Sequence, residues 1–330
     1  MAASHSRRFV LNICMGPIVP KPARCRGGRE NGRMESLRVP PTAAGGLFPP
    51  LPCALEALPL LGVDFSSAPS RQKPVVLAWG RRAGAVVKLE AIERFNALPT
   101  LAERLSAPGP WLGGFDLPFG LPRSLLQAWG WPLDWAEAMS RYARTSRPEL
   151  QAAFAAFCAA RPVGQKFAHR VCDGPAGASP SMKWVNPPVA WMMHAGVPLL
   201  RTAGVTLVGH EAGDPARLAL EAYPGLLARA VLGRRSYKSD EKAKQTPERL
   251  IARKDLVDAL EQGRQPWGLR LRLSHAQREA LVEDARGDTL DAVLCLLQAA
   301  WGAGQPRGGW PEDADALEGW ILGAGTVPAP

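Results

Sequence analysis

Apolar runs that end in turn residues follow one another along the chain and predict an α/β protein whose folded part opens near Leu60. The run LPLLGVDFSSA leads from apolar residues into Asp64 with small residues behind it, a pattern typical of a buried strand that ends in a loop. PVVLAWGRRAGAVVKLEAI contains two short strand-like runs around a Gly-Arg-Arg-Ala-Gly turn. WLGGFDLPFGLP is a further apolar strand that ends in Asp116 and is closed by a rigid Gly-Leu-Pro turn.

Later segments predict two more strands and several helices. Residues 205–208 and 218–223 have the composition of strands, and Glu221 lies near the end of the second. Apolar residues at helical spacing predict helices over 91–105 (with Pro99 as an interruption), 247–260 and 288–301.

A long insertion, at about 124–200, separates the Asp116 strand from these later strands. Its first part, 124–160, has helical periodicity, whereas 163–198 is rich in Gly and Pro and is our candidate substrate loop. Within this loop His169, Arg170, Asp173 and Lys183 are suited to contact a phosphate or position a leaving group, and the alternative is a surface ion pair between Arg170 and Asp173.

Residues 1–58 show no helical or strand period and are rich in Pro, Gly and Arg, which predicts a disordered basic extension. One alternative is a start codon farther downstream, for instance at Met34, and another is a basic arm that touches nucleic acid. A secretory signal is disfavoured because Asn12, Gly16 and Pro17 interrupt the only early apolar run. The domain is therefore expected over 59–323, with a tail at 324–330.

Composition limits the classes of function. The net charge of +10 and a pI of about 9.7 favour a polyanionic partner such as DNA or RNA, although many basic proteins bind no nucleic acid. The six cysteines form no CxxC pair, which argues against a zinc site or a disulfide scaffold and favours a reducing cytoplasm. No apolar stretch reaches the roughly 20 residues of a membrane span. Phosphate-binding glycine motifs, GxSxG and HExxH are absent.

Acidic residues at element ends are the candidate chemistry. Asp64, Asp116 and Glu221 each end an apolar run, and Asp288 and Asp291 lie three apart on one helix face. Two-metal phosphodiester hydrolysis needs several carboxylates at one point, and these five could converge there. Four of these acids also have a structural alternative: Asp64 and Asp116 as turn caps, Glu221 as the partner of an arginine, and Asp288 as a helix N-cap.

The segments GVDFSS, GFDLPFGLP, LEAYPGLL, SYK and GDTLDAVLCLLQAAW resemble the family named domain of unknown function 429, described as predicted nucleases of the ribonuclease H-like fold. DTLDAV also resembles the late-helix motif of the RuvC Holliday-junction resolvases. The resemblance spans roughly 60–322. It implies a mixed five-stranded sheet flanked by helices, with helical and Pro/Gly-rich insertions.

The same resemblance implies roles for individual acids. Asp64 matches the first-strand acid that bridges both metals, Asp116 the acid ending the fourth strand, Glu221 an acid on the fifth strand, and Asp288 with Asp291 the late-helix pair. RuvC enzymes have Glu where Asp116 stands and lack a counterpart of Glu221, so the metal geometry does not transfer directly.

These features together lead to the hypothesis of a Mg²⁺- or Mn²⁺-dependent nuclease that uses water as the nucleophile. Arg170, Lys183, Tyr237 and Lys238 are its expected substrate contacts, with the Tyr237 ring stacking on a base. A solvated charge run is the alternative for the last two residues. For the protein as a whole, the alternatives are a non-catalytic nucleic-acid-binding or scaffold protein and, by fold analogy alone, a phosphotransferase.

Overall fold

The computed structural model describes residue 48 and residues 58–327. All of them belong to one compact unit, Thr42–Pro330. The predictions for residues 1–58, including the downstream start at Met34, fall almost wholly outside the described residues, as does the end of the 324–330 tail. Ala324 and Val327, within that tail, are buried.

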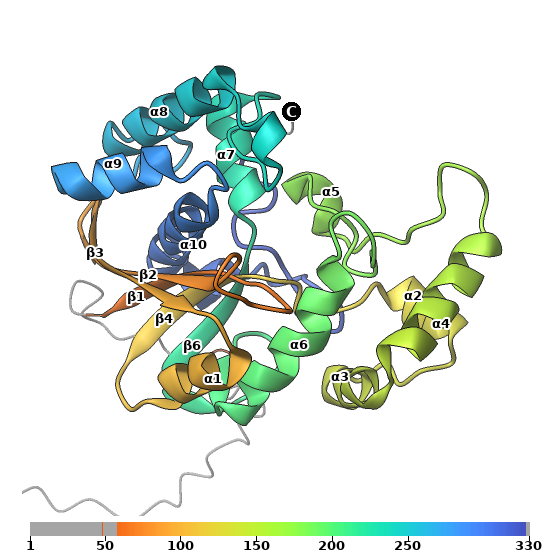
Figure 1. Ribbon diagram of the computed structural model, residues 1–330. Helices are drawn as coiled ribbons and strands as arrows, with labels where there is room; N and C mark the ends of the chain where they lie inside the picture. Colours follow the sequence, from red (N-terminus) through yellow and green to blue (C-terminus); the bar gives the residue numbers. More distant parts are fainter. Residues whose placement is uncertain (1–47, 49–57, 328–330) are drawn as a thin grey trace, which may run out of the picture. The chain divides into compact units, whose positions relative to one another are not determined.

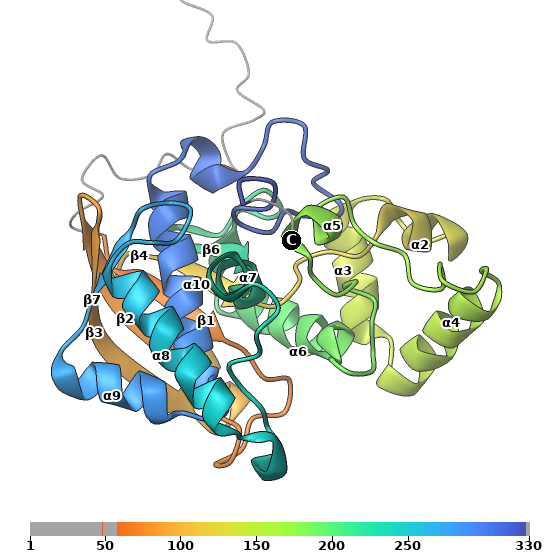
Figure 2. The same cartoon turned by 90° about the horizontal axis from the view of Figure 1, so that it is seen from above.

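A mixed sheet of seven strands is the centre of an α/β fold (Figures 1 and 2). Its strand order is β5-β6-β4-β1-β2-β3-β7. Strands β1, β4, β6 and β5 are mutually parallel, β2 is antiparallel to both of its neighbours, and β7 is parallel to β3. The strands are β1 (Leu60–Asp64), β2 (Val75–Ala83), β3 (Val86–Phe95), β4 (Trp111–Asp116), β5 (Val205–Leu207), β6 (Asp214–Ala222) and β7 (Arg270–Arg272).

The expected count of five strands was wrong. The segment 205–208 was predicted as a strand, and β5 confirms it. Strand β7 was not predicted, because a run as short as RLR gives no recognisable period. The predicted helix over 91–105 was also wrong at its start, because β3 continues to Phe95 and α1 spans Leu98–Ser106. Pairing along the whole of β2 overrides the local helical spacing there, and Pro99 lies in the first turn of α1, where proline is tolerated.

Helices cover both faces of the sheet. The long helix α10 lies directly on one face, and α7, α8 and α9 pack outside it, whereas α1 and α6 cover the opposite face (Figures 1 and 2). An apolar cluster fills each layer. The helices on the α10 side are α7 (Pro224–Leu232), α8 (Pro247–Glu261), α9 (His275–Glu283) and α10 (Asp288–Ala303).

The inserted segment is more helical than its composition predicted. It contains α2 (Arg123–Ala128), α3 (Trp135–Arg144), α4 (Arg147–Ala159), α5 (Asp173–Ala176) and α6 (Val189–Thr202). The predicted loop over 163–198 therefore ends where α6 begins. Pro198 lies inside α6 and obscured its helical pattern. No helix among the described residues is long and apolar enough to cross a membrane.

Helix α10 is buried on nearly all sides, and its backbone lies directly against the sheet. Glycines make this approach possible. A Cβ on Gly62 would overlap the backbone of α10 at Ala292 and Leu296, and a Cβ on Gly114 would lie 2.6 Å from the carbonyl oxygen of Cys295. The two strands therefore have no side chain where the helix rests.

This contact predicts that Gly62→Ala destabilises the fold by about 3 kcal/mol or more, because α10 can move away only by disturbing a close-packed core. Urea denaturation measures the loss. Gly174→Ala is the matched control, since a Cβ added at Gly174 would meet no atom within 4 Å and the φ of this residue is not left-handed; it should shift stability by at most about 0.5 kcal/mol. Equal effects of the two substitutions would contradict the close contact.

Candidate metal centre

Strands β1 and β4 carry the same Gly-x-Asp sequence at their carboxyl ends. The strands are in register, with Gly62 opposite Gly114 and Asp64 opposite Asp116. Because alternate residues of a strand face the same side of a sheet, both acids point to the side where the glycines receive α10. Gly62 and Gly114 were not singled out from the sequence, although a glycine two residues before an acid in two separate strands was a detectable signal.

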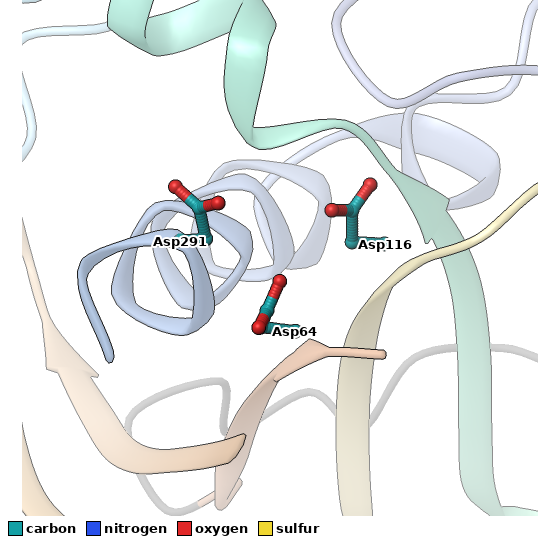
Figure 3. A group of neighbouring side chains, drawn as sticks. All are labelled: Asp64, Asp116 and Asp291. Atoms are coloured by element: carbon teal, nitrogen blue, oxygen red, sulfur yellow. The ribbon is translucent and has the colours of Figure 1, made fainter. Parts of the chain in front are cut away.

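The third acid comes from the helix that rests on these glycines. Asp291 lies in the first turn of α10, and its backbone N–H donates to the carbonyl of Gly287. Carboxylate oxygens of Asp64, Asp116 and Asp291 all lie within 4.8 Å of one another (Figure 3). Three of the five predicted acids therefore form one group, named here the acid cluster.

Two carboxylates of the acid cluster are poorly compensated. Within the described part of the chain, no group donates a hydrogen bond to the Asp64 or Asp116 carboxylate. Burial raises the pKa of Asp64 well above its usual value; the positive charge of Lys238 opposes this shift, and the charges of Asp116 and Asp288 add to it. Burial likewise raises the pKa of Asp116 to about 7, against the opposing effect of Lys238 and with a further contribution from Glu221.

Asp291 is held by two groups that the sequence had suggested as substrate contacts. The Tyr237 hydroxyl donates to one carboxylate oxygen of Asp291, and the Lys238 ammonium donates to the other. The backbone carbonyl of Tyr237 in turn accepts from Arg253 at 2.8 Å. Burial raises the pKa of Tyr237 well above its usual value, so its hydroxyl is protonated and able to donate. The positive charge of Lys238 therefore lies at the acid cluster, and the Lys238 side chain is 40% exposed.

Asp288 lies beside the acid cluster and is not one of its members. It is the first residue of α10, whose N-cap is Gly287, so the alternative of Asp288 as the N-cap was wrong. Burial raises the pKa of Asp288, and the charge of Lys73 opposes that shift. Asp288 and Asp64 also interact electrostatically. The Lys73 ammonium is 2.7 Å from Asp240.

Glu221 belongs to a different group of charges. In the β4–β6 pairing Glu221 lies opposite Phe115, whereas Ala222 lies opposite Asp116. A shift of one residue in a strand reverses the side to which a residue points, so Ala222, and not Glu221, faces α10 beside the cluster. The structure therefore does not bring Glu221 together with the three aspartates.

The Glu221 carboxylate is instead part of a buried ion-pair network. Arg170 donates to both of its oxygens, at 2.6 and 2.8 Å, and the N–H of Phe119 donates to one of them at 2.9 Å. The same guanidinium binds Asp173 at 2.9 and 3.0 Å and the carbonyl of Glu318 at 3.1 Å. The alternative of an ion pair between Arg170 and Asp173 is confirmed, but its expected location at the surface was wrong, because both side chains are at most 1% exposed.

No described contact joins Lys183 or His169 to the acid cluster. The backbone carbonyl of Lys183 accepts from Ala190 at 2.9 Å, which joins the segment before α6 to that helix. His169 is exposed. These contacts do not test the predicted role of Lys183 in substrate binding.

A cavity of about 380 Å³ opens beside the acid cluster. The cavity wall includes Asp116, a member of the acid cluster, and Lys238, which donates to Asp291. The cavity and the acid cluster are therefore continuous. Much of the remaining wall comes from the end of β6, from α6 and α7, from the segment after α5 and from the stretch that leads to Tyr237. No pattern in the sequence indicated this cavity, since its wall combines segments far apart in the chain.

The fold and the acid cluster define an α/β protein with a carboxylate site at the carboxyl ends of its central parallel strands. Residues 62–315 match the sequence profile of the family described as protein of unknown function DUF429, and the chain belongs to that family. Comparisons with curated proteins and with solved structures give no significant match.

The buried network predicts that Arg170→Met destabilises the protein by about 3–5 kcal/mol, because it leaves Asp173 and Glu221 buried without their cation. Arg123→Met is the comparison. Arg123 also makes a two-point pair, with Asp315, but its side chain is 41% exposed, so a loss of at most about 1 kcal/mol is expected. Thermal and urea unfolding compare the variants, and similar losses would argue against the network as a structural element.

Proposed function

We propose that this protein is a divalent-metal-dependent nuclease of the ribonuclease H-like fold. The five central strands, β3-β2-β1-β4-β6 with only β2 antiparallel, support the fold because they form the mixed five-stranded core expected of it. The resemblance implied acids at the ends of two strands and on a late helix. The proximity of Asp64, Asp116 and Asp291 supports the proposal on this point.

The observation that carries the proposal is the convergence of Asp64, Asp116 and Asp291 from three separate elements. Their donor atoms fit Mg²⁺ or Mn²⁺, because hard divalent cations prefer carboxylate oxygens and the group contains no sulfur or imidazole ligand. Two of the carboxylates have raised pKa values, which indicates that their negative charge lacks sufficient compensation from the protein. A bound cation would supply it.

Separate roles follow for the residues around the site. Asp64, Asp116 and Asp291 would hold one ion, and Asp288, which interacts electrostatically with Asp64, would contribute to a second. Bound divalent ions would neutralise phosphate charge and make water a stronger nucleophile near neutral pH. Tyr237 fixes the orientation of Asp291 through its hydroxyl.

Lys238 would have two alternating partners. A lysine ammonium and a divalent cation compete for the same carboxylate of Asp291, so ion binding weakens the Lys238 contact. A released ammonium can donate to a phosphate oxygen. The net charge of +10 would add attraction for a polyanionic DNA or RNA substrate.

Asp64→Asn and Asp116→Asn should each reduce Mn²⁺ affinity by about tenfold or more and abolish cleavage of labelled DNA and RNA, because each removes an ionised ligand. Titration calorimetry measures the affinity, and gel assays measure cleavage. Asp313→Asn, at an exposed acid outside the site, is the control and should change neither. Wild-type cleavage by the Asp64 variant would refute the proposal, and Mn²⁺ binding without any cleavage by the wild-type protein would favour a non-catalytic role.

Metal affinity should fall as the pH is lowered through about 7. The Asp116 pKa is raised from its ordinary 3.8 to about 7, so between these values the folded protein carries a proton on Asp116 that a metal ion must displace. We expect more protons to be released per bound ion at pH 6 than at pH 8, as calorimetry in buffers of different ionisation enthalpy would show. Asp116→Asn should reduce this release, and the release that remains is assigned to Asp64, whose pKa is also raised. Equal release at both pH values would contradict the assignment.

A further inference from the structure

The cavity beside the acid cluster has the size and position of a small-ligand site. Its volume of about 380 Å³ lies near the lower end of the roughly 300–1,000 Å³ that ligand pockets span. Helix α7 begins at its wall, where Pro224 and Gly225 are lining residues, so the positive end of the α7 dipole lies at the cavity. Asp116 and Lys238 lie at its boundary with the acid cluster.

The wall combines apolar surface with positive charge. Met192, Val189 and Ala228 provide aliphatic surface, and Tyr223 and Tyr237 provide aromatic rings. Arg229, Arg235 and Lys238 also line the cavity. The carboxylate of Glu221 faces it as well, but that charge is compensated by Arg170.

Of the two arginines, Arg229 is held by neighbours that leave its charge available, whereas Arg235 is paired with a carboxylate. The Arg229 guanidinium lies 5.2 Å from the centre of the Tyr223 ring and donates at 2.6 Å to the carbonyl of Ala176. These contacts engage neutral partners, so the positive charge of Arg229 is not cancelled by them. Arg235 is paired with Asp255 at 2.6 Å, on the exposed side. An anionic ligand with a flat apolar part is the chemistry that such a wall fits.

We infer that this cavity binds one unstacked nucleotide of the polynucleotide substrate, with its base between the apolar walls and its phosphate toward Lys238 and Asp116. The inference rests on the proposed nuclease function, because the acid cluster at the mouth identifies which anion is expected there. A cavity of about 380 Å³, near the lower end of the range for ligand pockets, suits one nucleotide rather than a stacked run of them. The substrate therefore reaches the acid cluster as a single strand or with one nucleotide rotated out of the helix.

Nucleotide binding in the absence of divalent metal tests the inference separately from cleavage. The full-length protein in EDTA is titrated with 2′-deoxyadenosine 5′-monophosphate, with its ribonucleotide counterpart and with inorganic phosphate, by calorimetry and ligand-observed NMR. A single-stranded DNA carrying one 2-aminopurine, and the same strand in a duplex, report base unstacking by fluorescence. Either mononucleotide is expected to bind more tightly than phosphate alone.

Ala178→Phe fills the cavity from the segment after α5, where Ala178 is half-buried. It should weaken mononucleotide binding by about tenfold or more, because the new phenyl ring occupies the space proposed for the base. Ala230→Phe is the matched control, since Ala230 is exposed on α7 and lies outside the cavity. If thermal unfolding shows that Ala178→Phe does not fold, Met192→Trp fills the same cavity from α6.

The outcomes separate the two proposals. Mononucleotide binding that the cavity-filling variant loses supports the inference, even if no metal-dependent cleavage is found, in which case the nuclease proposal alone fails. Metal-dependent cleavage that persists at the wild-type rate in the cavity-filling variant overturns the inference and leaves the nuclease proposal standing. Phosphate that binds as tightly as the mononucleotides also overturns it, because the cavity then recognises no base.

Discussion

Direct backbone contact between α10 and the central sheet is the constraint on which the acid cluster depends. Gly62 and Gly114 leave β1 and β4 without side chains where α10 lies, so the helix comes closer than any larger residue would permit. The first turn of the helix then brings Asp291 beside the acids that follow these glycines by two positions. Packing in the core and the geometry of the acid cluster are therefore consequences of one close contact, and a change that pushes the helix outward separates the three carboxylates.

Two groups of acids at this end of the sheet differ in how far neighbouring groups compensate their negative charge. Glu221 and Asp173 share the guanidinium of Arg170 and receive further hydrogen bonds from the protein, which stabilises them as a permanent structural group. Asp64 and Asp116 face the other layer and receive no comparable compensation from the described residues. Alternation along β4 and β6 places Glu221 and Asp116 on opposite sides of the sheet. Only the second set retains negative charge that an added cation can neutralise.

Local sequence patterns located the three members of the acid cluster. Apolar runs placed Asp64 and Asp116 at strand ends, and helical spacing placed Asp291 on a helix. Glu221 was misplaced because the pattern located the end of β6 without fixing its register against β4, and a single residue decides the side. The contacts that Tyr237 makes with Asp291 could not be predicted, since they join segments whose approach depends on the complete fold. The cavity escaped prediction for the same reason, and strand β7 escaped it because three residues give no recognisable period.

The acid cluster combines Asp64 from β1 with Asp291 from α10, which lies far later in the chain. During synthesis β1 and β4 emerge from the ribosome long before α10, so at that stage their acids have no third carboxylate beside them. A nascent chain, or one truncated before α10, therefore cannot assemble the acid cluster. The three carboxylates come together only once α10 has packed on the sheet.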